Sequence, residues 1–273
     1  GVQTCALPIY CTRGLWLDWQ AQGTRVTQNL FHDNTPPEGT VITPILGLGE
    51  DIFIEVSHGP TLIDNNLLLS HCACRISTQG MAFVHNLIAG SFTWVGEGVE
   101  NGGSYLPTPR YTPYHMKHRT EVAGFMTILH GDMRFYNNIF VQQALRQDYV
   151  EYAKEFVNGD GRECYPFVCG TKPYDGYPTP EEYFSKFGPW KMEDEGAKDK
   201  YYERLPVATG GNLYFNGAKP CDSEKDAYED KEHRITLELI EENGAPVLKT
   251  NLYEFLPEME TKTISTATLG EAF

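Results

Sequence analysis

The chain has 273 residues, of which 41% are hydrophobic, so it can build a folded core, and wholesale disorder is excluded. Its formal net charge is −15, from 37 acidic and 22 basic residues. Nucleic acid and anionic membrane surfaces are poor partners for so acidic a chain, whereas a neutral sugar chain is compatible with it.

The sequence shows no apolar run long enough to span a membrane and no signal peptide, which favours a cytoplasmic protein. Its seven cysteines form no disulfide framework, which agrees with reduced thiols. We expect no metal, because Cys72 and Cys74 beside His71 lack a second ligand pair at zinc spacing. We read residues 1–9 as a non-native leader and residues 10–273 as part of one domain whose true N-terminus is missing.

A repeat emerges when the chain is followed from its first strand-like stretch. In four segments a strand-like run precedes an Asn and two apolar residues follow it: "VTQNLF", "LIDNNLLL", "FVHNLIAG" and "FYNNIFV". Their asparagines are Asn29, Asn66, Asn86 and Asn138, and a later "GGNLYF" around Asn212 resembles them. Side chains of stacked Asn residues can hydrogen-bond to one another and to the turn backbone, so we expect a structural role for them.

A second strand precedes each of these turns. Counting eleven positions back from the first four asparagines reaches Asp18, Glu55, Arg75 and Thr127, and a Gly follows each within four or five residues. Each unit therefore reads as strand, glycine corner, strand and Asn turn. This predicts an all-β fold, a right-handed parallel β-helix with N-terminal coils missing, with long loops and a few short helices. An antiparallel sandwich is the alternative.

The remaining segments predict loops, one helix and one hairpin. Residues 35–50 and 91–123 are expected to be long loops that leave the coil. The stretch "QQALRQDYVEYAKEFVNG" has helical spacing, and residues 234–256 predict two strands around the "ENGAP" turn. We expect the acidic run 222–233 to be a solvated surface.

The aligned carboxylates are the strongest candidates for chemistry. If Asp18 and Glu55 occupy the same position in adjacent coils, they lie about 5 Å apart, because neighbouring strands are spaced by roughly 4.8 Å. Retaining glycosidases place their two carboxyl groups roughly 5 to 5.5 Å apart, whereas inverting ones need about 6.5 to 9.5 Å. Two carboxyl groups so close cannot both ionise freely, so one would keep its proton and serve as the general acid. The other interpretation is that both acids are ordinary surface residues.

Nearby residues favour a sugar site over a plain surface. The aromatic rings of Trp16, Trp19 and Phe53 surround the two acids and can desolvate them. The predicted substrate-binding residues are Trp19 and four polar side chains that could bind sugar hydroxyls, Gln20, Gln22, His58 and Arg119. His58 is equally compatible with a histidine bonded to turn backbone. Arg75, aligned with Glu55, could hold a hydroxyl or form a plain ion pair.

The segments "GLWLDWQAQGTRVTQNLFHDN", "DIFIEVSHGPTLIDNNLLLS" and "VHNLIAG" resemble the catalytic stretch of glycoside hydrolase family 120, the β-xylosidases on a right-handed β-helix. The resemblance runs from about residue 10 to the end, as the C-terminal part of such an enzyme, and implies Asp18 as nucleophile and Glu55 as acid/base. The implied reaction is retaining release of xylose from the non-reducing end of β-1,4-xylo-oligosaccharides, with no cofactor. Relative to the family pattern, a preceding His-Glu pair is missing and residues 35–50 look inserted.

The sequence is also compatible with two functions other than a glycosidase. A polysaccharide lyase on the same fold would use a base beside Arg or Lys, for which Asp18, Glu55 and Arg75 could serve. The third reading is a non-catalytic carbohydrate-binding β-helix. The sequence leaves open whether the chain forms a homo-oligomer.

Overall fold

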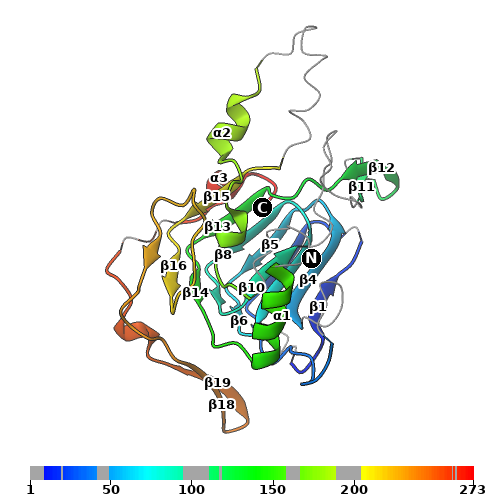
Figure 1. The fold of residues 1–273 in the computed structure, drawn as a ribbon. Coiled ribbons are helices and arrows are strands. Elements are labelled where there is room, and N and C mark those ends of the chain that lie inside the picture. Colours follow the sequence, from blue (N-terminus) through cyan, green and yellow to red (C-terminus); the bar gives the residue numbers. More distant parts are fainter. Residues whose placement is uncertain are drawn as a thin grey trace.

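The computed structural model describes residues 9–19, 21–41, 49–94, 111–116, 119–157, 167–188, 204–259, 261 and 263–273. Most of its strands belong to three sheets in which every pairing is parallel (Figure 1). The first sheet has four strands, in the order β1 (Arg13–Leu17), β4 (Glu50–Ser57), β7 (Cys72–Thr78) and β10 (Ser91–Trp94).

The second and third sheets alternate along the chain with the first. The second has five strands, β2 (Thr24–Thr27), β5 (Thr61–Asp64), β8 (Met81–Val84), β13 (Met133–Tyr136) and β15 (Val207–Gly210). The third has six short strands, β3 (Leu30–Phe31), β6 (Leu67–Leu68), β9 (Leu87–Ile88), β14 (Ile139–Val141), β16 (Leu213–Phe215) and β17 (Tyr228–Glu229). Up to β10 the chain adds one strand to each sheet in turn, and each new strand pairs with the previous strand of its sheet. Strands β13 to β17 then extend the second and third sheets only.

Helices are few among the described residues, and two hairpins there are antiparallel. The helices are α1 (Gln147–Val157), α2 (Pro180–Ser185) and α3 (Thr266–Leu269), with 3-10 turns at Lys172–Tyr174 and Leu252–Glu254. Strands β11 (Tyr111–His115) and β12 (Val122–Thr127) pair with each other, as do β18 (Leu237–Glu242) and β19 (Ala245–Thr250). Figure 1 shows these hairpins far apart. The helix and the C-terminal hairpin expected from the sequence are therefore present.

The expectation of a right-handed parallel β-helix is wrong, because the described strands do not close into a solenoid. The three sheets have unequal numbers of strands, and the first ends at β10 while the other two continue. The stretch aligned on Thr127 adds no strand to the first sheet; it forms β12 and pairs with its sequence neighbour β11. The outer edge of β10 is instead met by an antiparallel bridge from Cys169 to Ser91. Ser91–Trp94, expected in a loop, is a strand.

Apolar side chains from all three sheets meet in one core. Strand β7 is buried along its whole length, as expected of a parallel strand covered on both faces. Phenylalanine rings from successive strands stack, with Phe83 and Phe135 5.4 Å apart between centroids and nearly parallel. Phe140 and Tyr214 stack similarly at 5.0 Å. Burial of this core fixes the strand register at the surface, including that of β1 and β4.

The predicted stack of asparagines is confirmed and includes the later Asn212. The Oδ1 of Asn66 accepts from the backbone N and from Nδ2 of Asn29, both at 3.0 Å. The same pattern repeats through the ladder Asn66, Asn86, Asn138 and Asn212. All five side chains are buried. The ladder therefore satisfies turn backbone that would otherwise be buried without partners.

The ladder ends on a carboxylate. Nδ2 of Asn212 donates to Oε1 of Glu224 at 2.8 Å, and the hydroxyl of Tyr214 donates to Oε2 at 2.6 Å. Burial raises the pKa of Glu224, partly offset by these hydrogen bonds. The interpretation of residues 222–233 as a solvated surface is thus wrong at Glu224, which is a buried acceptor at the end of the stack.

Candidate active site

Strands β1 and β4 place Asp18 and Glu55 at the same level. Leu17, the last residue of β1, pairs with Ile54 of β4. The residues that follow this pair are the two acids, Asp18 and Glu55. Ile54 lies in the core and Leu17 packs against it, which locks the two strands in this register. Asp18 is exposed and Glu55 is partly buried. Adjacent parallel strands lie roughly 4.8 Å apart, so the two acids lie side by side at the C-terminal ends of neighbouring strands.

The first strand turns sharply after Asp18. The backbone N of Ala21 donates to the carbonyl of Asp18 at 3.1 Å, and Oδ1 of Asp18 accepts from the backbone N of Trp19 at 2.7 Å. Oγ of Ser57, at the end of β4, donates to the carbonyl of Ala21 at 3.1 Å. These bonds fasten the corner after β1 to the corner after β4. The carboxylate of Asp18 is therefore held beside the backbone amide of Trp19.

Arg75 does not join this pair, which corrects the sequence alignment. It pairs with Phe53, while Ser77 is the residue opposite Glu55. Strand β4 carries a bulge between Glu55 and Ser57, and Val56 there has a φ of 48°. The bulge in β4 and the corner after β4 each contain one more residue than the matching parts of β7 and of the corner after it. Counting eleven residues back from Asn86 therefore misses the true partner of Glu55 by two residues.

Arg75 instead forms a buried ion pair with Glu50. Its Nη1 lies 3.2 Å from Oε1 of Glu50, and both side chains are only 2% exposed. Its guanidinium stands 5.0 Å from the ring of Phe53, and that ring packs against the ring of Trp16, with 5.6 Å between centroids and a tilt of 32°. Arg13 covers both rings from above, at 4.6 and 4.9 Å. This column stiffens β1, β4 and β7 next to the two carboxylates.

Two of the predicted sugar-binding side chains lie together. Nε2 of Gln22 is 3.3 Å from Nε2 of His58, and it donates to the carbonyl of Pro113 in β11 at 3.3 Å. The pKa of His58 is lowered, mainly by burial and further by His115, so its imidazole is neutral at pH 7. Neutral imidazole and amide groups can each donate and accept a hydrogen bond, as sugar hydroxyls require.

The other predicted residues are placed differently. Trp19 is 52% exposed, beside Asp18. Arg119 lies in the turn of the β11–β12 hairpin and forms an exposed bidentate pair with Glu121, at 3.1 and 2.9 Å. Gln20 lies outside the described residues. Phe125, whose ring meets that of Trp19, was not singled out from the sequence, because nothing there marks the hairpin as a neighbour of β1.

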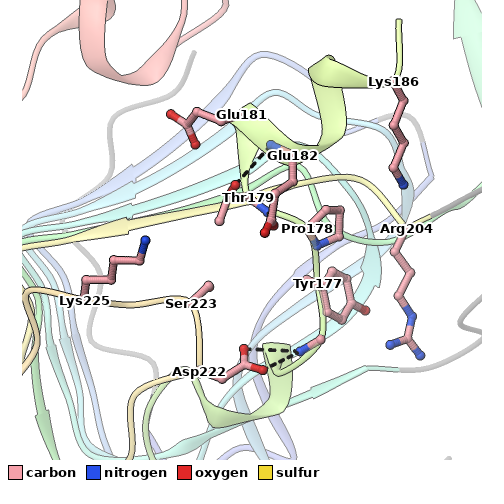
Figure 2. A pocket seen from close by; sticks show the side chains of 11 residues that line it. Tyr177, Pro178, Thr179, Glu181, Glu182, Lys186, Arg204, Asp222, Ser223 and Lys225 are labelled. Carbon is pink, nitrogen blue, oxygen red and sulfur yellow. Dashed lines mark hydrogen bonds between the residues drawn. The ribbon is translucent and has the colours of Figure 1, made fainter.

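A sizeable cavity among the described residues lies away from the two carboxylates. About 1060 Å³ of open space lies between α2 and the loop at residues 222–225, and no lining residue belongs to the carboxylate site (Figure 2). Two of its acids are engaged: Glu182 accepts from the backbone N of Thr179 in a capping box, and Asp222 accepts from that of Gly176. The lining residues are Gly176, Tyr177, Pro178, Thr179, Glu181, Glu182, Lys186, Arg204, Asp222, Ser223 and Lys225.

The described residues contain neither a cluster of metal-binding side chains nor a membrane-spanning helix. No three side chains of the types His, Cys, Asp and Glu gather there as a metal site would need. No helix in the same part of the chain is long and apolar enough to cross a membrane. Cys72 and Cys74 are buried, and burial raises the pKa of both thiols well above the usual range, mainly by desolvation.

The chain is similar to a solved structure over most of its length. A solved structure described as "The complex structure of XylC with xylose" shares 37% identical residues with this chain, at a TM-score of 0.63. The match covers 89% of this chain and 31% of that chain, so this chain spans less than a third of that relative's length. No family model matches the chain, and no curated protein matches it. The chain is therefore related in sequence and fold to a protein that binds xylose, while its place in family 120 stays a prediction.

Proposed function

We propose that the chain carries the catalytic carboxylates of a retaining β-xylosidase that releases xylose from the non-reducing end of β-1,4-xylo-oligosaccharides. The observation that carries the proposal is the pairing of Leu17 with Ile54, which brings Asp18 and Glu55 to adjacent strands at one level. Strand spacing of roughly 4.8 Å matches the separation of about 5 Å that retaining enzymes need and is shorter than that of inverting ones. The relation to XylC, solved with xylose, supports the choice of sugar.

The mechanism assigns one step to each acid. The carboxylate of Asp18 attacks the anomeric carbon, and the carboxyl group of Glu55 gives its proton to the leaving oxygen as the glycosidic bond breaks. The resulting xylosyl ester on Asp18 is then hydrolysed by water. Glu55, now ionised, takes a proton from that water and returns to its starting form. The reaction needs no metal or organic cofactor.

Neighbouring side chains are proposed to bind the sugar. Gln22 and His58 lie at the corners after β1 and β4 and offer donors and acceptors to hydroxyl groups. Trp19 offers an apolar ring face, and Gln20 and Arg119 complete the predicted set. The lyase alternative loses its basic partner, because Arg75 is buried against Glu50. A cytoplasmic location also remains a proposal.

The experiment follows the anomeric proton of released xylose by NMR during cleavage of xylobiose. A retaining enzyme first yields the β-anomer, which then mutarotates. Asp18→Asn and Glu55→Gln should both slow early release by at least about 10²-fold, whereas Glu238→Gln, at an exposed acid on the distant β18, should not. Initial release of the α-anomer, or unchanged turnover in both active-site variants, would overturn the proposal.

A further inference from the structure

The β11–β12 hairpin presents an exposed aromatic ring beside the candidate nucleophile. Phe125 of β12 is 59% exposed and Trp19 is 52% exposed. Their ring centroids are 6.5 Å apart with an interplanar angle of 61°, an edge-to-face contact. Residues 106 positions apart in the chain thus form one apolar surface. Large adjoining apolar side chains left in water commonly mark a place where something binds.

This surface is fastened to the candidate catalytic groups. The backbone N of Trp19 donates to Oδ1 of Asp18 at 2.7 Å, so the ring and the carboxylate share one turn. The hairpin is tied to the same corner, because the carbonyl of Pro113 accepts from Gln22 at 3.3 Å. Gln22 in turn lies against His58. The aromatic surface therefore continues directly from the polar groups assigned to the sugar.

Strand geometry separates the two faces of the hairpin. Successive side chains of a strand point to opposite sides, so Phe125 and Met126 face different ways. Phe125 is the one that meets Trp19, and Met126, 44% exposed, lies on the other face. A two-stranded hairpin is marginal in water by itself, so its contacts with the corner help to hold it in place.

We propose that Trp19 and Phe125 form an aromatic wall of the substrate site, which binds the apolar C–H face of a pyranose ring in the oligosaccharide. The inference rests on the proposed function and adds Phe125 to the substrate-binding residues. The wall supplies apolar contact area on one side of the ring. Gln22 and His58, which adjoin the wall, supply hydrogen bonds to hydroxyl groups, and this combination is typical of small-molecule sites.

The test measures binding of xylobiose by calorimetry in the whole chain carrying Asp18→Asn, which prevents turnover during titration. Adding Phe125→Ala should weaken binding about two- to thirteenfold, because an aromatic contact contributes about 0.5 to 1.5 kcal/mol beyond burial. Phe125→Tyr should restore it, since the ring face remains. Matched controls are Phe184→Ala, a ring 63% exposed on α2, and Met126→Ala on the other face of the hairpin; neither should change the affinity.

The outcomes separate the wall from the proposed function, which is judged by xylose release from the unsubstituted chain. If that chain releases xylose and Phe125→Ala binds as tightly as the two controls, the wall is wrong and the function stands. If xylose is not released but Phe125→Ala alone weakens binding, the wall stands and the function is wrong. Absence of xylobiose binding in the Asp18→Asn chain would overturn the wall. Loss of binding in Phe125→Tyr as well as Phe125→Ala would also count against a ring-face contact.

Discussion

Leu17 of β1 pairs with Ile54 of β4, and this single contact determines which acids can act together. Glu55, one residue beyond, is partly buried, whereas Asp18 is exposed. A partly buried acid beside an exposed one suits the division into proton donor and nucleophile.

Replacement of Glu55 by Gln should therefore affect substrates unequally. The variant cannot protonate the leaving oxygen, so cleavage of xylobiose should fall by about 10²- to 10⁴-fold. A nitrophenyl xyloside has a leaving group that departs without protonation, so its first step should be slowed less. The measurement compares kcat/KM for both substrates. Equal losses for the two would argue against a proton-donating role.

The asparagine ladder predicts a graded loss of stability. Asn66 bonds to ladder members on both sides, Asn29 and Asn86, whereas Asn29 occupies the first position of the ladder and bonds to Asn66. Asn66→Ala removes a partner from the backbone N of Asn29 and from the carbonyls of Val26 and Asp64, at about 1–3 kcal/mol for each buried group left without one. Urea unfolding should therefore show a larger loss of free energy for Asn66→Ala than for Asn29→Ala. Equal losses of unfolding free energy in the two variants would contradict this prediction, because the additional contacts of Asn66 would then contribute nothing to stability.

The contrast between these asparagines and Arg75 shows what the sequence could predict. The ladder leaves a residue pattern because each turn needs the same short amide side chain. The spacing of 37 residues between Asn29 and Asn66 equals that between Leu17 and Ile54, so counting back correctly aligned Asp18 with Glu55. Asn66 and Asn86 are 20 residues apart, but Ile54 and its partner Ile76 are 22 apart.

The two spacings differ by two residues, which lie in β4 and in the corner after it, where the sequence predicts no irregularity. One is at the bulge of Val56, a β-branched residue in the left-handed region, where propensity predicts no such conformation. The antiparallel pairing of β12 was missed for a related reason. Its composition suits any strand, and only the short turn back to β11 decides its partner. Tertiary pairing of this kind placed Phe125 beside Trp19.

The corner after β4 should tolerate no side chain at Gly59. Its φ is +77°, and a Cβ there would lie 2.3 Å from the carbonyl oxygen of Gly80. Gly23 has a similar φ of +63° with nothing within 4 Å, so it isolates the backbone strain alone. Gly23→Ala should cost about 1–2 kcal/mol, the usual penalty of this conformation. Gly59→Ala should lower the thermal midpoint clearly further; equal shifts would mean that the corner can open without cost.

Asp51 should make stability fall as pH rises. The carboxylate is fully buried, and burial raises its pKa from 3.8 to about 7 despite hydrogen bonds from Ser70 and Asn34. Nδ2 of Asn34 donates to Oδ1 at 2.9 Å and the backbone N of Ser70 to Oδ2 at 3.1 Å. Since the folded chain holds this proton more tightly than the unfolded chain, the contribution to stability is complete below about pH 4 and is lost by about pH 7.

The size of this effect follows from the shift, at about 1.4 kcal/mol per pKa unit, which gives about 4 kcal/mol across the window. Asp51→Asn removes the titration while keeping the shape, so its unfolding free energy relative to the unsubstituted chain should improve steadily from pH 4 to pH 7. Urea unfolding at closely spaced pH values measures the difference. Glu238→Gln, at an exposed position on β18, should leave the slope unchanged. Parallel profiles for Asp51→Asn and the unsubstituted chain would show that Asp51 is already ionised in the fold.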